Sequence, residues 1–390
     1  HKANHAPLLQ RGVLMKYARS ISPAIALAVL SNAVTAQTMA PPVAAPSYWV
    51  YVANESSDLV SRVRFGPDGA VEERTIRVGI KPADLDGAHG LSVSPTGDYW
   101  YLSLAHGTPY GMVWQFRTGT DEFVDSTTVG LFPATMGITA DGSMLFAVNF
   151  NLHGQRVPSS VSAIFTPFMD EVRKIETCVM PHGSRLSSDG ARHYSTCMMS
   201  DQLVEIHTAE LEVGRRLRLT KGHVGLLPLD EAGMHMVEGS CKPTWVAIAP
   251  DDASLYVPCN GRGEILEIDR ERLEVTRTFA TGKAPYNADV SPDGRYLVTS
   301  LKGAQAVSII DLESGAERRV ATTQPVTHGV VVTPDSRYAF ITNEAIGAVR
   351  GTVDVIDIAA GERVASVEVQ FQPGGIGFWK MEAAETEANP

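Results

Sequence analysis

A short plan of two strands around a tight turn recurs along this chain, and it restricts the possible folds more than any other feature. Each copy has an alternating strand, a turn similar to Pro-Asp-Gly, and a second strand that ends near Asn or Ser. The six complete copies read GLSVSPTGDYWYLS, GITADGSMLFAVN, GSRLSSDGARHYSTC, VAIAPDDASLYVPCN, NADVSPDGRYLVTS and GVVVTPDSRYAFITN. Most equivalent positions lie about 42 to 48 residues apart, a period typical of one four-stranded sheet per repeat.

Two incomplete copies lie at opposite ends of the chain and complement each other. A first strand without a second, PGGIGFW, starts at Pro373, and a second strand without a first, YWVYVAN, starts at Tyr48. We expect Gly374 onward to pair with residues 48–77, because joining the chain ends inside one sheet removes open sheet edges. The sequence therefore predicts an all-β fold, a seven-bladed β-propeller of four-stranded blades over residues 48–380, closed by a blade that the two termini share.

The regions outside the repeats have the pattern of export and processing segments. Residues 15–36 combine a basic front, an apolar run and a small-residue ending, which is typical of a secretory signal peptide. The apolar run is short for a membrane span, so we expect none in the mature chain. We predict an upstream extension plus signal peptide at 1–36, a linker at 37–47, a disordered tail at 381–390, and a periplasmic or secreted protein.

Composition narrows the class of partner. Hydrophobic residues make up 44% of the chain and charged residues 20%, values typical of a globular protein. The formal net charge is -11, and lysine and arginine form no basic stripe. We therefore expect no nucleic-acid partner.

One position is equivalent in every repeat, seven residues before the turn. About 0.2 histidines would be expected in these seven slots by chance, because the chain has 11 histidines in 390 residues. Three are present, in blades 1, 3 and 6. The slots hold His89, Ala134, His182, Thr244, Tyr286, His328 and Gly374.

The innermost strand of each blade lines the central channel, so the slot is expected at the channel mouth, where functional sites of propellers gather. Three converging imidazoles are a ligand set typical of Cu, Fe or Zn, with positions left open for substrate. We predict that His89, His182 and His328 bind one transition metal ion. The alternative is that each histidine only hydrogen-bonds a neighbouring blade, and a shift of one residue would turn the rings into the blade interface.

Other polar side chains are expected on the same funnel-shaped face. Tyr286 is the predicted auxiliary catalytic group, a proton donor or one-electron partner; the alternative is a buried hydroxyl that satisfies a carbonyl. Further contributors are His106, His153, His235, Thr244 and Asn287, and the carboxylates Asp84, Asp86 and Glu344 are candidates to orient imidazoles.

An insertion at residues 219–240 is expected to enter the funnel as a partial lid. It contains Met234, His235 and Met236, and thioether and imidazole ligands suit copper(I). The alternative is a loop whose methionines pack on the funnel rim.

The four cysteines follow the repeat. Cys197 and Cys259 end second strands, while Cys178 and Cys241 come just before the matching first strands, and antiparallel neighbours bring these positions together. We predict two disulfides, Cys178–Cys197 and Cys241–Cys259, inside blades 3 and 4, as expected in an oxidising compartment. A thiolate metal site or a redox pair is the alternative.

The strand endings YVAN, FAVN and FITN, with following passages such as GEILEIDRERLEVTRTFATG and GTVDVIDIAAGERVASVEV, resemble the YVTN-type β-propeller repeats. The resemblance covers Tyr48 to Trp379. It implies a seven-bladed propeller similar to the N-terminal domain of nitrous oxide reductase and to lactonase-like proteins. Because such relatives differ in activity, the resemblance implies the fold and leaves the function open.

These patterns favour a metal-dependent oxidoreductase that takes a small-molecule substrate or a partner protein at the funnel face. The G-x-S-x-G, G-x-G-x-x-G and Walker motifs are not present in the sequence. Two alternatives remain: a non-catalytic propeller that binds a protein, a glycan or a metal ion, and a lactonase-like hydrolase.

Overall fold

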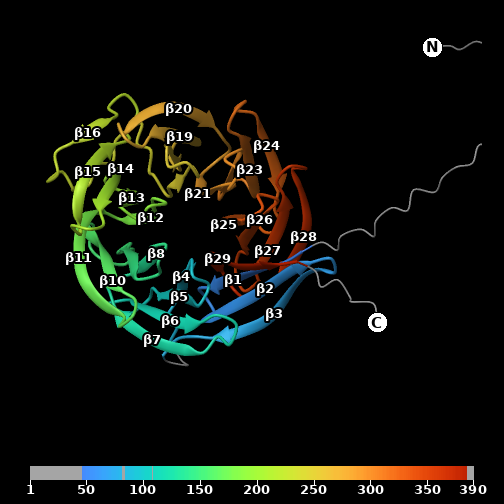
Figure 1. Ribbon diagram of the computed structural model, residues 1–390. Helices are drawn as coiled ribbons and strands as arrows, with labels where there is room; N and C mark the ends of the chain where they lie inside the picture. The colour runs from blue at the N-terminus through green and yellow to red at the C-terminus, as the bar shows by residue number, and fades with distance from the viewer. Residues whose placement is uncertain (1–45, 81–83, 108, 384–390) are drawn as a thin grey trace, which may run out of the picture. The chain divides into compact units, whose positions relative to one another are not determined.

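The computed structural model describes residues 46–80, 84–107 and 109–383. These residues contain 29 strands and no helix, and the strands form seven antiparallel sheets arranged as the blades of a ring (Figure 1). No helix in this part of the chain therefore meets the length and hydropathy that a membrane span requires. The predicted all-β, seven-bladed propeller is confirmed.

The blades are numbered from the first complete repeat, and strands are given from the channel outward. Blade 1 contains β4 (Ala88–Val93), β5 (Tyr99–Leu104), β6 (Met112–Arg117) and β7 (Phe123–Thr128). Blade 2 contains β8 (Pro133–Ile138), β9 (Met144–Asn149), β10 (Pro158–Phe165) and β11 (Asp170–Val179). Blade 3 contains β12 (Pro181–Leu186), β13 (Arg192–Cys197), β14 (Gln202–His207), β15 (Glu212–Arg218) and β16 (Gly225–Leu227).

The remaining blades follow the same plan. Blade 4 contains β17 (Ala247–Ile248), β18 (Ser254–Cys259), β19 (Glu264–Asp269) and β20 (Glu274–Ala280). Blade 5 contains β21 (Pro285–Val290), β22 (Tyr296–Leu301), β23 (Ala306–Asp311) and β24 (Glu317–Ala321). Blade 6 contains β25 (Val326–Val332), β26 (Tyr338–Glu344), β27 (Thr352–Asp357) and β28 (Glu362–Glu368). Blade 7 contains β29 (Pro373–Glu382), β1 (Ser47–Asn54), β2 (Leu59–Gly66) and β3 (Gly69–Arg77).

Blade 7 closes the ring with strands from both ends of the chain. β29 pairs antiparallel with β1, with Tyr51 opposite Gly377, and Figure 1 shows the red and blue strands side by side. The shared blade is therefore confirmed. Its strands start at Ser47 and end at Glu382, slightly beyond the predicted limits of 48 and 380. The predicted signal peptide and most of the predicted linker and tail lie outside the described residues.

Blade 3 departs from the four-stranded plan because the 219–240 insertion supplies a fifth strand. β16 pairs with β15 at the outer edge of the sheet, with Leu217 opposite Leu226. This part of the insertion therefore extends the blade outward, and the prediction that the whole insertion enters the funnel is wrong. Its later part returns to the end of β13, where the His235 amide donates to Met199 O at 2.7 Å.

Neighbouring blades pack face to face through apolar side chains, so the core is a ring of clusters between sheets. Between blades 7 and 1, Trp100 is fully buried. Its ring stacks on Phe116 at a centroid distance of 4.0 Å and on Tyr51 at 5.1 Å. Such aromatic contacts add stability beyond the burial of area. The closed ring therefore gives a stable frame on which the loops at either end are held.

Both predicted cysteine pairs form disulfides, Cys178–Cys197 and Cys241–Cys259. The second bond lies within blade 4. The first does not lie inside blade 3 as predicted, because Cys178 belongs to β11, the outermost strand of blade 2. The chain passes directly from that strand to the inner strand of the next blade, so this disulfide joins blades 2 and 3. Two disulfides are consistent with an extracytoplasmic location.

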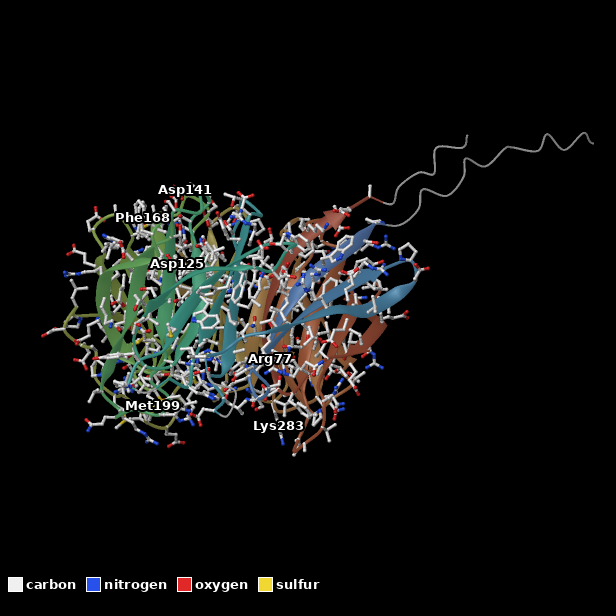
Figure 2. All side chains as sticks on the ribbon, turned by 90° about the horizontal axis from the view of Figure 1, so that it is seen from below. Arg77, Asp125, Asp141, Phe168, Met199 and Lys283 are labelled. Carbon is white, nitrogen blue, oxygen red and sulfur yellow. A yellow bond between two sulfur atoms is a disulfide. The ribbon has the colours of Figure 1, made fainter. Side chains whose placement is uncertain are left out.

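The ring has two distinct faces. The funnel face carries the starts of the innermost strands and the ends of the second strands, and the turn face carries the Pro-Asp-Gly-like turns. Figure 2 shows Met199 and Lys283 on the funnel face, with Asp141 and Phe168 on the opposite side. The histidine slots belong to the funnel face.

Candidate active site at the channel mouth

Each histidine slot lies in a β-bulge at the start of an innermost strand. The register between first and second strands shifts between Ala88 and Leu91, so His89 and Gly90 have no paired residue opposite them. The Gly90 amide instead donates to Ser103 Oγ at 2.7 Å. A bulge redirects the side chain at its centre. The same shift occurs around His182 and His328.

Close contact between blades explains why a glycine follows each of these histidines. A Cβ atom at Gly90 would lie 1.9 Å from Ala134 O, and one at Gly183 would lie 2.4 Å from Thr244 O. The backbone after the histidine thus lies directly against the slot residue of the next blade, and only glycine fits.

The three predicted imidazoles come together at the channel mouth. The ring centroid of His89 lies 6.5 Å from that of His182 and 6.4 Å from that of His328. All three side chains are buried, with residue exposures of 9%, 1% and 6% for His89, His182 and His328. The rings therefore face a common space and are not turned into the blade interfaces.

His182 is fixed in one tautomer by its neighbours. Its Nδ1 lies 3.0 Å from Thr244 O, and because a carbonyl oxygen only accepts, this nitrogen carries the hydrogen. Its Nε2 is then an acceptor and receives the Tyr286 hydroxyl at 2.9 Å. Burial, with the charge of His89, lowers the pKa of His182 to about 3, so the ring is neutral at neutral pH.

His89 is held by a buried carboxylate that the sequence analysis did not consider. Its Nδ1 lies 2.8 Å from Glu55 Oε2, and the other oxygen of Glu55 lies 2.8 Å from His106 Nε2. Gln372 Nε2 also donates to Glu55 at 3.1 Å. Burial alone would raise the pKa of Glu55, but the charge of His89 and the hydrogen bonds from His106 and His89 hold it well below its ordinary value. The hydrogen bond to Glu55 raises the pKa of His106.

His328 has a similar but looser arrangement. Its Nε2 lies 3.5 Å from Glu344 Oε1, and its buried Nδ1 has no hydrogen-bond partner within the described part of the chain. Burial places the pKa of His328 well below its ordinary value. Lys302 Nζ lies 3.4 Å from the same Glu344 oxygen, and burial raises the pKa of Glu344 despite this lysine. Glu344, a sequence candidate to orient an imidazole, therefore lies beside His328.

Tyr286 lies between two of the imidazoles. Its ring centroid is 5.3 Å from that of His182 and 4.7 Å from that of His328, and Lys302 Nζ lies 4.4 Å from the phenol centroid. Burial raises the pKa of Tyr286 far above its ordinary value, so the phenol keeps its proton. Thr244 positions this strand, because its Oγ1 donates to Tyr286 O at 2.8 Å.

Glu55 and Lys302 were not considered in the sequence analysis, although the repeat contains a signal for them. With Glu344 they occupy one aligned position, directly after Asn54, Leu301 and Asn343 in blades 7, 5 and 6. The residue before each pairs with the residue just before a slot. A second aligned position therefore surrounds the histidines with charged groups.

The other predicted contributors lie at different depths. His106 and His153 are neighbours, with ring centroids 6.0 Å apart, and both pack on Phe132. The His235 amide donates to Met199 O, beyond the end of β13. The Asp86 carboxylate accepts the Ile80 amide at 2.6 Å, and the carboxylate that contacts His89 and His106 is Glu55.

The channel contains a small cavity of about 50 Å³ next to the imidazoles, lined by His89, His182, His328 and Asn287 together with apolar side chains such as Leu91 and Val330. Three buried atoms on its lining residues have no hydrogen-bond partner among the described residues: His328 Nδ1, Asn287 Oδ1 and Trp245 Nε1. A cavity of this size holds one or two water molecules. The imidazoles thus border a small cavity of mixed polar and apolar lining as well as the funnel.

The donor set fits a transition metal ion, whereas the ring spacing is wider than a bound ion requires. Buried imidazoles with one anchored nitrogen are typical metal ligands. Rings that share one ion have centroids about 5 Å apart, because each metal–nitrogen bond is about 2.0 to 2.1 Å. The observed centroid distances of 6.4 and 6.5 Å are larger, and His182 Nε2 already accepts a hydrogen bond from the Tyr286 hydroxyl. Within residues 46–80, 84–107 and 109–383, no group of three or more His, Cys, Asp or Glu side chains is already spaced to hold an ion.

Comparison with known proteins identifies the fold and leaves the activity undetermined. No protein-family model and no curated protein matches the sequence. Among solved structures, the periplasmic gluconolactonase of Pseudomonas aeruginosa is similar with a TM-score of 0.64 and 16% identity over 85% of this chain and 99% of that chain. Dihydro-heme d1 dehydrogenase NirN has a TM-score of 0.56 and 16% identity, over 87% and 76%. Hydrazine synthase of Kuenenia stuttgartiensis has a TM-score of 0.55 and 20% identity, over 73% and 80%. At these identities the likeness shows the propeller fold, and no family model supports membership of the YVTN-type repeat family.

Proposed function

We propose that this protein is a metal-dependent enzyme whose transition metal ion is held at the channel mouth by His89, His182 and His328. One observation supports this best: each imidazole is buried and has one nitrogen against or near an oxygen of the protein. An anchored nitrogen fixes the ring and leaves the other nitrogen for an ion. The anchoring oxygens are Glu55 Oε2, Thr244 O and Glu344 Oε1.

The ligand atoms follow from these anchors. His89 and His182 offer Nε2, because their Nδ1 atoms face Glu55 and Thr244 O. His328 offers Nδ1, the buried nitrogen without a hydrogen-bond partner within the described part of the chain. Copper or iron at this position supplies one-electron chemistry, and zinc supplies a Lewis acid.

The chain's own groups would handle protons around the ion. Tyr286 now donates its hydroxyl hydrogen to His182 Nε2, so this hydrogen becomes available for a substrate oxygen once His182 Nε2 is engaged elsewhere. Lys302, 4.4 Å from the phenol centroid, stabilises negative charge that develops there. Glu55 keeps the hydrogen of His89 on Nδ1 and so preserves the ligand tautomer.

The cavity that leads to the cluster suits a small polar substrate, and the ligand set favours an oxidoreductase. An open cavity of about 670 Å³ on the funnel face is lined by Ser56, Glu344 and Gln372, and it reaches the cluster at Glu344. An all-nitrogen ligand set with open positions suits redox chemistry on copper or iron. One of the structurally similar proteins, the dihydro-heme d1 dehydrogenase, carries a redox activity in its name.

The direct test is metal stoichiometry. Metal-free mature protein is loaded separately with Cu²⁺, Fe²⁺ and Zn²⁺, desalted and measured by elemental analysis. We expect about one ion per chain for at least one metal, and a loss of more than tenfold in the His182→Ala variant, because one of three ligands is removed. His207→Ala, a histidine on the turn face, is the matched control and should keep its ion. Full occupancy in His182→Ala, or none in the unmodified protein, would contradict the proposal.

A lactonase-like hydrolase is the second candidate, and one contact favours it. The Glu55–His89 pair at 2.8 Å has the geometry of an oriented general base, and Tyr286 is a protonated donor nearby. The similar fold of a periplasmic gluconolactonase agrees with this reading. Under it, hydrolysis of gluconolactone persists in chelator and is lost in Glu55→Gln. A protein that binds an ion, a glycan or a partner without any turnover would instead be the non-catalytic propeller.

A further inference from the structure

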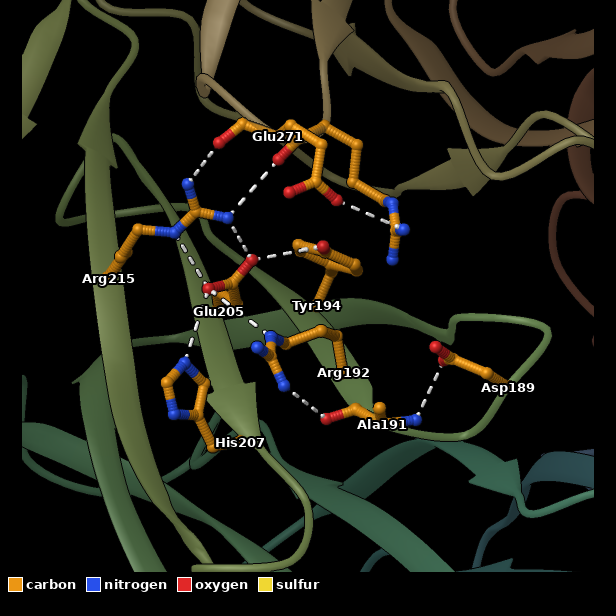
Figure 3. Close-up of a pocket in the computed structure, with 9 residues that line it drawn as sticks. Asp189, Ala191, Arg192, Tyr194, Glu205, His207, Arg215 and Glu271 are labelled. Atoms are coloured by element: carbon orange, nitrogen blue, oxygen red, sulfur yellow. Dashed lines mark hydrogen bonds and ion pairs between the residues drawn. The ribbon is translucent and has the colours of Figure 1, made fainter.

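A second polar pocket lies on the turn face between blades 3 and 4, with a volume of about 260 Å³ (Figure 3). The strand register separates it from the histidines. Arg192 begins β13 and pairs with His207 at the end of β14, whereas Cys197 ends β13 opposite Pro181, the residue before His182. The pocket is therefore at the opposite end of blade 3 from the candidate active site.

The floor of this pocket is a closed ion pair. Glu205 has a side-chain exposure of 1%, and Arg215 donates to both its oxygens, at 2.7 and 2.5 Å, while the Tyr194 hydroxyl donates at 3.0 Å. Arg215 also donates to the carbonyl oxygens of Glu271 and Arg270 in blade 4, at 2.6 and 3.2 Å. Both charges of this pair are thus satisfied inside the protein.

Two other guanidinium groups on the pocket walls keep donors to spare. Arg192 donates from Nη1 to Ala191 O at 3.1 Å, and its Nε lies 3.8 Å from Glu205, too far for a hydrogen bond. Arg270 pairs with Glu271 at 3.2 Å and also interacts with the Tyr194 hydroxyl, while its buried Nε has no hydrogen-bond partner among the described residues. Figure 3 shows Arg192 beside Tyr194 and Glu205.

The carboxylates at the rim do not satisfy these arginines. Asp189 accepts Ser187 Oγ at 2.6 Å and the Ala191 amide at 2.9 Å, and so is held by its own turn. Glu271 has a side-chain exposure of 82%, and an ion pair this exposed is worth little. The formal charges of three arginines and three carboxylates balance, yet the two wall arginines face the pocket with weak partners.

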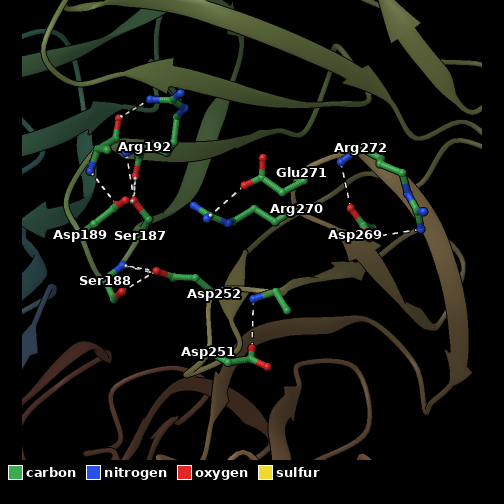
Figure 4. A network of polar contacts seen from close by, with 12 residues as sticks. Ser187, Ser188, Asp189, Arg192, Asp251, Asp252, Asp269, Arg270, Glu271 and Arg272 are labelled. Carbon is green, nitrogen blue, oxygen red and sulfur yellow. Dashed lines mark hydrogen bonds and ion pairs between the residues drawn. The ribbon is translucent and has the colours of Figure 1, made fainter.

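The frame of the pocket is rigid. The Ser188 amide donates to both oxygens of Asp252, at 3.1 and 3.0 Å, which fastens the turn of blade 3 to the turn of blade 4 (Figure 4). His207 packs against Gly214, where an added Cβ would lie 2.2 Å from Nε2. The turns of blades 3 and 4 beside the pocket are therefore held together.

We propose that this pocket binds a small oxyanion, through a carboxylate or phosphate group that bridges Arg192 and Arg270. Guanidinium groups match the paired oxygens of both ligand types and remain charged at every physiological pH. The bound group displaces the exposed Glu271 carboxylate from Arg270. The volume suits a ligand of the size of phosphate or a small dicarboxylate, and the site is independent of the metal proposal.

The test is calorimetric titration of the full mature protein with inorganic phosphate and, separately, with succinate, each at ionic strength matched with chloride. We expect saturable binding of at least one, and a loss of about tenfold or more in Arg192→Gln and in Arg270→Gln, because each removes a charge-assisted hydrogen bond. Arg272→Gln is the matched control, since Arg272 is 63% exposed, pairs with Asp269 and lies outside the pocket (Figure 4).

Each outcome decides the question. Preference for phosphate or for succinate identifies the ligand class, and both results support the site. Absence of saturation by either anion, or unchanged binding in both wall variants, overturns it, as does equal weakening in Arg272→Gln. Arg192→Lys guards against misfolding, because it keeps the charge and loses the planar fork; it should bind more weakly than the unmodified protein and more tightly than Arg192→Gln, with an unchanged circular dichroism spectrum.

Discussion

Glu55 at the channel mouth and Glu205 in the turn-face pocket are both buried glutamates, but they have different partners. Glu55 bridges the imidazoles of His89 and His106, whereas Glu205 is bound by the guanidinium of Arg215. Neighbouring cations lower the pKa of both carboxylates against the opposing effect of burial.

The difference lies in what the partner can do. An imidazole can lose its proton, accept one or bind an ion, so the charge around Glu55 is adjustable. A guanidinium keeps its charge, so Glu205 belongs to a permanent structural pair. The channel mouth is therefore suited to chemistry and the turn-face pocket to static recognition of an anion.

The largest expected effect comes from removing the frame that both regions share. Blade 4 supplies Thr244 to His182 and Arg270 to the pocket, and the Cys241–Cys259 bond closes 18 residues of it. Replacing both cysteines by serine should lower the free energy of unfolding by about 3 kcal/mol, measured by urea denaturation. The Cys178–Cys197 bond, with a separation of 19, should give a similar loss. A loss below about 1 kcal/mol in both variants would contradict the chain-entropy argument.

The permanent pair should be the more important of the two glutamates for stability. Glu205→Gln leaves Arg215 without its carboxylate, and we expect a loss of about 2 kcal/mol in urea denaturation, at the low end for buried pairs because Arg215 is partly exposed. Glu271→Gln, which changes an exposed carboxylate of the same pocket, should stay within about 0.5 kcal/mol. Equal effects of the two variants would show that Glu205 is not the structural centre.

Acidification should reduce stability through the buried histidines and through Glu205 in different pH ranges. The buried histidines His182 and His193 have a pKa lowered to about 3 by burial, so the unfolded chain binds more protons below about pH 6.5. Their contribution to stability is complete above that pH and falls as the pH drops toward 3, by about 1 kcal/mol for each between pH 7 and 5.5. Glu205, with its lowered pKa, contributes a loss only below its ordinary titration range near 4.5.

His193→Phe tests this window without touching either site. His193 is fully buried, has no hydrogen-bond partner on either nitrogen and stacks on Phe146. The free energy of unfolding of the metal-free protein, measured by urea denaturation, falls between pH 7 and pH 5.5. We expect this fall to be smaller by about 1 kcal/mol in the variant than in the unmodified protein. An unchanged decrease would mean that the buried imidazoles do not control acid sensitivity.

A smaller effect on stability than at Glu205 is expected at Glu55. Glu55→Gln keeps an oxygen that can accept a hydrogen bond from His89, so we expect a loss of about 1 kcal/mol in the free energy of unfolding, measured by urea denaturation. Metal affinity, measured by competition with a chelator, should nevertheless fall about 10- to 100-fold, because the orientation of His89 is lost. A large loss of stability with unchanged affinity would reverse the roles assigned to Glu55 and Glu205.

The repeat made the architecture predictable. Aligning the turns placed His89, His182 and His328 in one slot and paired Pro373 onward with β1, because a propeller repeats one local plan. The direction of the histidine side chains was not predictable from the sequence. It depends on β-bulges, which the structure shows as a shift of strand register and a hydrogen bond from the Gly90 amide to Ser103 Oγ.

The residues that were missed depend on contacts between blades. Glu55 reaches His89 from the neighbouring blade, and the turn-face pocket joins Arg192 of blade 3 to Arg270 of blade 4. Neither contact is local in sequence. The placement of Cys178 in blade 2 was missed for a related reason, because the boundary between one blade and the next lies within the passage from β11 to β12.

The most direct measurement of the central claim is a crystal structure of metal-loaded protein with anomalous diffraction at the metal absorption edge. The account predicts one anomalous peak at the channel mouth, within bonding distance of His89 Nε2, His182 Nε2 and His328 Nδ1, with Tyr286 released from His182. A fully loaded protein whose anomalous peak lies elsewhere, for example at Met234 and His235, with the Tyr286–His182 hydrogen bond intact, would contradict it.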